Sequence, residues 1–214
     1  METESPSEIF EANAKKLDRI LQSTGARLDP TRFSHELHIS PFETSDLSQI
    51  GESLEAAAKF FGFEPVLENH RYFTATVTGA EKKRNQRDAA SIILSAKESL
   101  AQQSEPRQSK NLHLLVSNQD LFALRMNFVF GLANSELGIA VMSTYRLTKW
   151  TEDLTPSQIQ ERVLKEASHE IGHLIGLAHC KKNSCMMSFS ENLEQVDLKL
   201  PLLCGDCSRK IGLK

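Results

Sequence analysis

The sequence predicts an α+β protein whose N-terminal part alternates strands and helices as α/β folds do. Two strand-like segments flank an amphipathic helix within residues 37–69, and three more strand-like segments lie between residues 111 and 147. A longer amphipathic helix begins at residue 156. With 214 residues the chain is long enough to bury a core, and this length favours one domain over two independent ones.

The first expected element is a helix over residues 5–21. Ser5, Pro6 and Glu8 form a capping-box pattern with proline at the first helical position. Six apolar residues then share one helical stripe: Ile9, Phe10, Ala14, Leu17, Ile20 and Leu21. We therefore expect residues 1–35 to be a helical extension that packs against the body of the protein.

Residues 37–40 and 65–69 predict two strands, the first of which ends at Pro41. Between them, apolar residues at helical spacing predict a helix that Gly62 closes: Leu47, Ile50, Leu54, Ala57, Ala58 and Phe61. A third helix is expected over residues 89–100, followed by a polar surface loop at 102–110.

Three strands are predicted at residues 111–117, 127–133 and 138–147. The sequence NSEL with Gly138 after it joins the last two, which is typical of a hairpin. Thr155, Pro156 and Gln158 then repeat the capping pattern and begin the long helix. This helix carries the segment HEIGHLIGLAHC, residues 169–180.

The histidines of this segment have the spacing of metal ligands. His169 and His173 are four residues apart, so on a helix their side chains share one face, with Cβ atoms about 5–6 Å apart, and can bind one ion. Glu170 is rotated by about 100° from His169, beside the open position of such an ion, where a general base is needed. His179 can join the same ion only if the chain turns back, and Gly176 permits that turn. The alternative is that the histidines are hydrogen-bonded polar groups of a buried helix.

The four cysteines form two close pairs. Cys180 and Cys185 are separated by four residues, Cys204 and Cys207 by two, and eighteen residues lie between the pairs. This is the layout of a tetrahedral thiolate zinc site, and a closed site of four cysteines is structural. The segment is too short to build its own core, so the metal would stabilise it. The alternative is two disulfides or unrelated thiols.

Charge and composition restrict the partners and the compartment. A formal net charge of −3 gives no basic field for nucleic acid, and we interpret the cluster Lys82, Lys83, Arg84 and Arg87 as a solvated face. No apolar run approaches the roughly 18 residues of a membrane span, and the N-terminus is acidic where a secretory signal is basic. We expect a cytoplasmic monomer that binds neither nucleic acid nor membrane. Because the cytoplasm is reducing, we expect the clustered cysteines to bind metal and not to form disulfides.

These motifs closely resemble those of the archaemetzincins, a branch of the metzincin zinc peptidases. The family pattern is HExxHxxGxxH, then Cys, four residues, Cys-x-Met, about seventeen residues and Cys-x-x-Cys. Residues 169–207 follow it with one departure, because sixteen residues separate Met187 from Cys204. The resemblance makes Met187 the Met-turn residue beneath the metal, although Met186 is adjacent, and places the second zinc at the four cysteines.

The resemblance also implies a fold and a division of the chain. We expect a metzincin-like, mostly parallel mixed sheet with backing helices, an active-site helix and a small zinc-stapled C-terminal lobe. The catalytic domain would be residues 36–214, with an upper lobe over 36–176 and a lower lobe over 177–214. The edge strand near residues 127–134 would bind an extended substrate by β-addition.

The function that follows is hydrolysis of peptide bonds in a peptide or protein substrate. Two Zn²⁺ ions are expected per chain: a catalytic one at His169, His173 and His179 and a structural one at the cysteines. Glu170 would activate a zinc-bound water for attack on the scissile carbonyl and return the proton to the leaving amine. Two alternatives remain: a two-zinc binding or scaffold protein with little peptidase activity, and a zinc hydrolase of non-peptide amides.

Overall fold

The structure is a computed structural model that describes residues 35–43, 45–68, 73, 85–103, 111–148 and 154–212. The helix expected over residues 5–21 lies outside these ranges, as do Lys82, Lys83, Arg84 and most of the predicted loop at 102–110.

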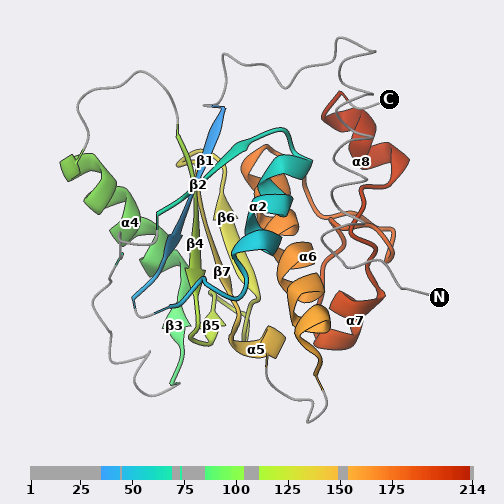
Figure 1. Cartoon of the computed structure of the whole chain (residues 1–214), viewed down its shortest axis with the longest axis horizontal. Coiled ribbons are helices and arrows are strands. Elements are labelled where there is room, and N and C mark those ends of the chain that lie inside the picture. The colour runs from blue at the N-terminus through green and yellow to red at the C-terminus, as the bar shows by residue number, and fades with distance from the viewer. Residues whose placement is uncertain are drawn as a thin grey trace.

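A five-stranded, mostly parallel sheet organises the protein (Figure 1). Its strands, in the spatial order β2-β1-β4-β7-β6, are β2 (Glu64–Leu67), β1 (Glu36–Pro41), β4 (Leu112–Ser117), β7 (Ile139–Ser143) and β6 (Gly131–Asn134). The first four run parallel, and β6 pairs antiparallel with β7 at one edge. Two short parallel strands, β3 (Arg87–Asp88) and β5 (Leu121–Phe122), form a second sheet.

Helices cover both faces of the main sheet. On one side lie α2 (Gly51–Phe60) and α6 (Pro156–Leu174), and on the other lies α4 (Ala89–Gln103) (Figure 1). Three short helices complete the described chain: α5 (Tyr145–Thr148), α7 (Leu193–Leu198) and α8 (Gly205–Lys210). Figure 1 shows α7 and α8 beyond α6, on the side away from the sheet.

The alternation of side chains along β4 explains the two cores. Leu112 and Leu114 belong to the core shared with α2 and α6, whereas Leu115 belongs to the core beneath α4. Because successive residues of a strand point to opposite faces, a strand covered on both faces is buried throughout and mostly apolar. All six residues of β4 are accordingly buried.

Most of the expected elements are present, with differences at their ends. The helix expected from Leu47 begins only at Gly51, and the helix expected to end at residue 100 continues to Gln103. The hairpin between β6 and β7 and the capped start of α6 are confirmed. The sequence did not predict β3, β5, α7 or α8, which are six residues long or shorter.

Three predictions were wrong in part. The strand expected at 127–133 begins only at Gly131, and the strand expected at 138–147 ends at Ser143, where α5 follows. Strand propensity overestimated both segments because β7 pairs only with residues 131–134 of the first, and β4 pairs with the second only from Ile139 to Ser143. Arg87 is also not part of a solvated face: it is 4% exposed, and its guanidinium donates to Glu43. A buried arginine of this kind needs a carboxylate partner, which sequence spacing does not reveal.

No helix in the described ranges combines the length and apolar character that crossing a membrane requires.

For the site, the most important feature of the fold is the edge of the sheet at β6. The helix α6 packs against this strand, and both elements contribute to the cavity described below.

Candidate metal centres

The helix α6 is fixed at its start by a complete capping box. The hydroxyl of Thr155 accepts from the backbone N–H of Gln158 at 3.3 Å, and the Gln158 side chain accepts from the Thr155 N–H at 2.9 Å. From Val163 to Gly172 every residue of the helix is buried. The ligand candidates of α6 are therefore carried on a rigid element with little freedom to turn outward.

His169 and His173 point their Nε2 atoms at one another, 3.0 Å apart. Each ring donates its Nδ1–H to a backbone carbonyl, His169 to Met186 at 2.9 Å and His173 to Leu177 at 2.7 Å. Those carbonyls can only accept, so they fix the tautomer and leave a lone pair on each Nε2. Nitrogens bound to one zinc at about 2.0–2.1 Å lie about 3.3 Å apart, close to the spacing observed.

A turn at the end of α6 brings His179 to the same place. Gly176 has φ +96°, its N–H donates to the His173 carbonyl, and the Leu177 N–H donates to the Gly172 carbonyl at 2.9 Å. This pair of hydrogen bonds is a Schellman motif with glycine at the left-handed position, as the spacing of Gly176 predicted. A ligand nitrogen of each of the three histidines then lies within 4.8 Å of the others.

The three imidazoles are held neutral. Burial lowers the pKa of His169 well below the ordinary imidazole value, and Lys199 and the neighbouring histidines lower it further while the Met186 carbonyl opposes them. Burial also lowers the pKa values of His173 and His179. Neutral imidazole is the form that binds metal, so the donor set fits a zinc ion.

Glu170 lies between α6 and the edge strand β6. A Cβ atom placed on Gly131 would lie 2.4 Å from Glu170 Oε1, so the carboxylate occupies the space that a side chain at Gly131 would need. Glu170 is 2% exposed, and its Oε2 has no hydrogen-bond partner among the described residues. Burial raises the pKa of Glu170 well above its ordinary value, Glu166 raises it further, and Lys199 opposes both.

The two methionines have different surroundings. A Cβ atom on Gly172 would lie 2.4 Å from Met187 Sδ, so the Met187 side chain packs directly against α6 between the two histidines of that helix. Met186 instead supplies the carbonyl that accepts from His169. Both side chains are fully buried. The contact with Gly172 favours Met187 as the residue beneath the histidines.

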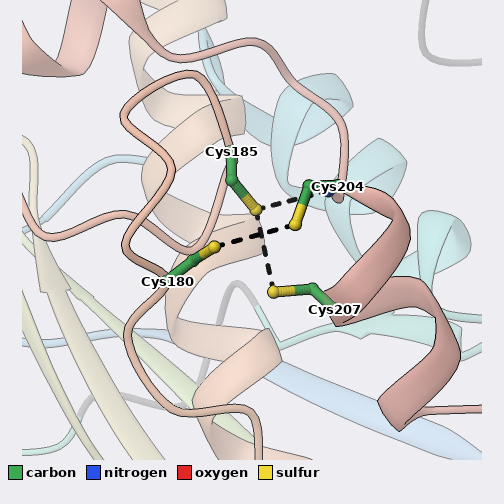
Figure 2. A group of neighbouring side chains, drawn as sticks. All are labelled: Cys180, Cys185, Cys204 and Cys207. Atoms are coloured by element: carbon green, nitrogen blue, oxygen red, sulfur yellow. Dashed lines mark hydrogen bonds between the residues drawn. The ribbon is translucent and has the colours of Figure 1, made fainter.

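Sulfur atoms of the four cysteines converge at a second site, shown in Figure 2. Cys180 Sγ lies 3.7 Å from Cys204 Sγ, and Cys185 Sγ lies 3.8 Å from Cys207 Sγ. A disulfide requires about 2.05 Å, so neither pair is bonded, and all four cysteines are free thiols. Four sulfurs in a tetrahedron at about 2.3 Å from zinc lie about 3.8 Å apart, so the spacing fits a zinc ion.

The position of Cys204 at the start of α8 favours its thiolate. Burial opposes ionisation, but hydrogen bonds from the backbone of Cys207 and Asp206 and from the Cys180 thiol lower the pKa of Cys204 to about 7. Burial raises the pKa values of Cys185 and Cys207. Without a cation the buried Cys185 and Cys207 would stay protonated, whereas a metal ion stabilises all four cysteines as thiolates.

The backbone joins the two sites. Cys180 follows His179 directly, and its N–H donates to the carbonyl of Met187 at 2.8 Å. The adjacent residue Met186 holds His169 through its carbonyl. Order at the cysteine site therefore reaches two of the three histidines through a single loop.

A cavity of about 770 Å³ opens beside the histidines. Its walls come from α6, from β6, from the segment 123–130 that precedes β6, and from residues 189–191. Arg146 positions the segment before β6: its guanidinium forms two hydrogen bonds to Asp120 and lies 3.8 Å from the centre of the Phe128 ring. Phe189, 43% exposed, lies beside His179, with the two ring centres 5.1 Å apart.

Comparisons with known proteins agree with this geometry. The sequence profile described as peptidase family M54 matches residues 81–212, more than half of the chain. The chain belongs to this family. The archaemetzincin of Aeropyrum pernix is 46% identical to this chain over 99 residues, a match that covers 46% of this chain and 52% of that protein. The archaemetzincin of Archaeoglobus fulgidus is 46% identical over 96 residues, covering 45% and 57%. This chain thus matches about half the length of these curated relatives.

Solved structures resemble a larger part of this M54 chain. A zinc-dependent peptidase from Methanocorpusculum labreanum has a TM-score of 0.70 at 28% identity, covering 82% of this chain and all of that one. An archaemetzincin from A. fulgidus, complexed with malonate, has a TM-score of 0.64 at 32% identity, covering 82% and 99%. The mixed sheet with backing helices expected from the sequence is thereby confirmed.

The structure brings together every residue that the motifs singled out, in two groups: His169, His173 and His179 with Glu170 beside them, and the four cysteines. It also adds Gly131, Glu166 and Lys199, which the sequence analysis missed. Glu166 precedes Glu170 by one helical turn, and this spacing was readable. Nothing local marked Gly131 or Lys199, because their roles arise from contacts with α6.

Proposed function

We propose that this member of family M54 hydrolyses peptide bonds, with a zinc ion held by His169, His173 and His179. The observation that carries the proposal is the arrangement of His169 and His173. Backbone carbonyls accept from the Nδ1–H of each ring, so both Nε2 lone pairs are free to bind a metal ion beside the buried carboxylate of Glu170, at the wall of an open cavity. A hydrogen-bonded buried helix would not need two imidazole acceptors facing each other at 3.0 Å. Membership of a peptidase family supports the same conclusion.

Each side chain has a role in this reaction. Zinc, when bound, supplies a Lewis acid that polarises the scissile carbonyl and acidifies water. Glu170 accepts the proton of the attacking water and delivers it to the leaving amine, and the upward shift of its pKa suits both steps. The Nδ1–H bonds to Met186 and Leu177 hold the two rings of α6 in place throughout.

The strand β6 is suited to hold the substrate. It is the last strand in the sheet order, and its residues line the cavity beside Glu170. An extended peptide can add to such an edge through main-chain hydrogen bonds, which places its carbonyls along the wall of the cavity. We infer that the substrate is a peptide or protein segment in extended conformation.

A second zinc ion is part of the proposal. Cys180, Cys185, Cys204 and Cys207 would enclose it, and its role would be to hold residues 177–214 as the lower lobe of a catalytic domain over residues 36–214, with Met187 as the Met-turn residue. The sulfur spacings and the packing of Met187 against Gly172 support these assignments. Four free thiols also suit a reducing compartment such as the cytoplasm.

The test is Glu170→Gln, which keeps the size of the side chain and removes the base. Wild type and variant are compared on a broad peptide library, with zinc content and thermal unfolding measured on the same samples. We expect unchanged zinc content and a loss of cleavage of about 10² to 10⁴-fold, the usual contribution of a general base. Glu52→Gln, in the exposed first turn of α2, is the matched control and should cleave as wild type does.

Two outcomes contradict the proposal. A Glu170→Gln variant that cleaves as fast as wild type would remove the carboxylate from the mechanism. A zinc-loaded wild type that cleaves nothing in the library would favour the scaffold alternative.

A further inference from the structure

Two charged side chains in the cavity wall have no task in the proposed mechanism. Glu166 and Lys199 both line the cavity beside Glu170, and they are 3% and 2% exposed. One comes from α6 and the other from the segment after α7. Charged residues are rarely buried to this extent without a direct partner, so this pair needs an explanation.

The position of Glu166 follows from α6. It lies four residues before Glu170, so both carboxylates emerge from the same face of the helix, one turn apart. Glu166 Oε2 is buried and has no hydrogen-bond partner among the described residues. A buried carboxylate oxygen of this kind is an acceptor available to a group that enters the cavity.

Lys199 is buried although its neighbours in the chain are not. Leu198 is 66% exposed and Leu200 is 54% exposed, whereas Lys199 between them is 2% exposed. Packing alone would favour the opposite arrangement, with leucines inside and the ammonium in water. The chain thus keeps an ammonium at the cavity wall at the expense of apolar burial.

The ammonium of Lys199 differs from that of the other buried lysine. Lys165 donates to the Asp197 carbonyl at 3.0 Å and pairs with Glu161 at 2.6 Å. In the described part of the chain Lys199 Nζ has no hydrogen bond or ion pair, although Glu166 and Glu170 attract it electrostatically. An acceptor and a donor therefore line one cavity without contacting each other.

We propose that Glu166 and Lys199 form a specificity subsite that receives a carboxamide side chain, asparagine or glutamine, of the peptide. The amide N–H donates to the Glu166 carboxylate, and the amide oxygen accepts from the Lys199 ammonium. The charges of the pair balance, so a neutral group with both a donor and an acceptor completes the site. A basic or acidic side chain would bury an additional charge, and an apolar one would leave both groups unpaired. The inference rests on the proposed function only in taking the cavity as the place where peptide binds.

Peptide binding to zinc-loaded Glu170→Gln protein tests the subsite without turnover. The probes are acetylated, amidated pentapeptides Ala-Ala-X-Ala-Ala in which X is glutamine, glutamate, lysine or leucine, and calorimetry gives each Kd. We expect the glutamine peptide to bind at least about tenfold more tightly than the leucine peptide, since hydrogen bonds to charged groups are the stronger ones. Adding Glu166→Leu, which removes the acceptor, or Lys199→Met, which removes the donor, should abolish this difference.

Lys165→Met is the matched control, because it removes a buried lysine whose ammonium is bonded elsewhere, and it should keep the glutamine preference. The four-peptide comparison needs no change at Lys199, so it decides the matter even if Lys199→Met fails to fold. Equal affinities, tightest binding of another peptide, no binding of any peptide, or a preference that survives both changes would each overturn the subsite. If glutamine is preferred but wild type cleaves nothing, the subsite stands and the peptidase proposal fails. If wild type cleaves peptides without the preference, the peptidase proposal stands and the subsite fails.

Discussion

Replacing Gly131 by alanine should disturb Glu170 without touching any metal ligand. The added Cβ would lie 2.4, 2.6 and 2.7 Å from Oε1, Cδ and Cγ of Glu170, about 1 Å closer than ordinary contact. Glu170 is 2% exposed and packed between α6 and β6, so either the carboxylate rotates toward the cavity or β6 moves away from α6. Overpacking of this kind costs about 1–3 kcal/mol of folding free energy.

For a chain of this size that loss lowers the Tm by about 2–12 °C. A shift of the base by about 1 Å is enough to reduce turnover about 10²-fold. The assay is hydrolysis of any peptide that wild type cleaves, with Tm and zinc content measured on the same protein, and zinc content should stay unchanged. Gly51→Ala is the control, because its Cβ would meet only Leu67 Cδ1 at 3.8 Å. Full activity in Gly131→Ala would refute the placement of Glu170 against β6.

The remaining predictions concern the two metal sites. A chelator should quickly remove the zinc ion of the histidine site, which opens to the cavity, and leave the protein folded. The ion at the cysteine site should stay, because four thiolates would enclose it. Loss of both ions together with unfolding would contradict the division into a catalytic and a structural site. The Cys204→Ala variant should lose both zinc ions and the ordered structure of residues 177–214, because the loop after Cys180 also holds His169. Metal analysis and circular dichroism measure the two losses. A folded variant that binds both ions would be inconsistent with this coupling. Because the folded-state pKa values of all three histidines are lowered, zinc at their site should survive acidification through the ordinary imidazole value of 6.5 and dissociate only below it. Metal analysis after equilibration at graded pH checks this, and release above pH 6.5 would count against the neutral histidines. The folding stability of the metal-free protein should depend on pH in the same direction. Because the three histidines have lowered pKa values in the folded state, they contribute stability above the pKa of an unfolded histidine, and this contribution is lost as pH falls.

The position of Lys199 at the cavity wall also explains the unusual burial pattern of the segment that follows α7. Exposed leucines around a buried lysine are the reverse of ordinary patterning, so the sequence LKLPLL would be read as an apolar segment with a solvated lysine. The structure shows that the residue of this segment at the cavity wall is the polar one. Exposed leucines beside a buried lysine depart from the usual burial pattern, and such departures are expected at functional sites, where function overrides packing.

Local regularities were enough to predict much of the fold. The helices α2, α4 and α6 and the strands β1 and β4 follow from apolar periodicity and from caps, which depend only on neighbours in the chain. The start of β6 and the short helix α5 did not follow, because strand propensity cannot say how far a partner strand extends. Arg87 was misjudged for a related reason, since its partner Glu43 lies 44 residues earlier.

The sequence by itself was enough to propose the ligand sets of both candidate metal centres. His169 and His173 share a face because the helix repeat places them there, and the turn at Gly176 follows from the conformational freedom of glycine. Only the tertiary structure decided what surrounds those ligands: the contact of Gly131 with Glu170, the packing of Met187 on Gly172, and the position of Lys199 at the cavity wall. The physical reason is range. Ligand spacing along a helix or turn is a local property of the backbone, whereas these contacts join segments far apart in the chain whose approach depends on the packing of the whole domain.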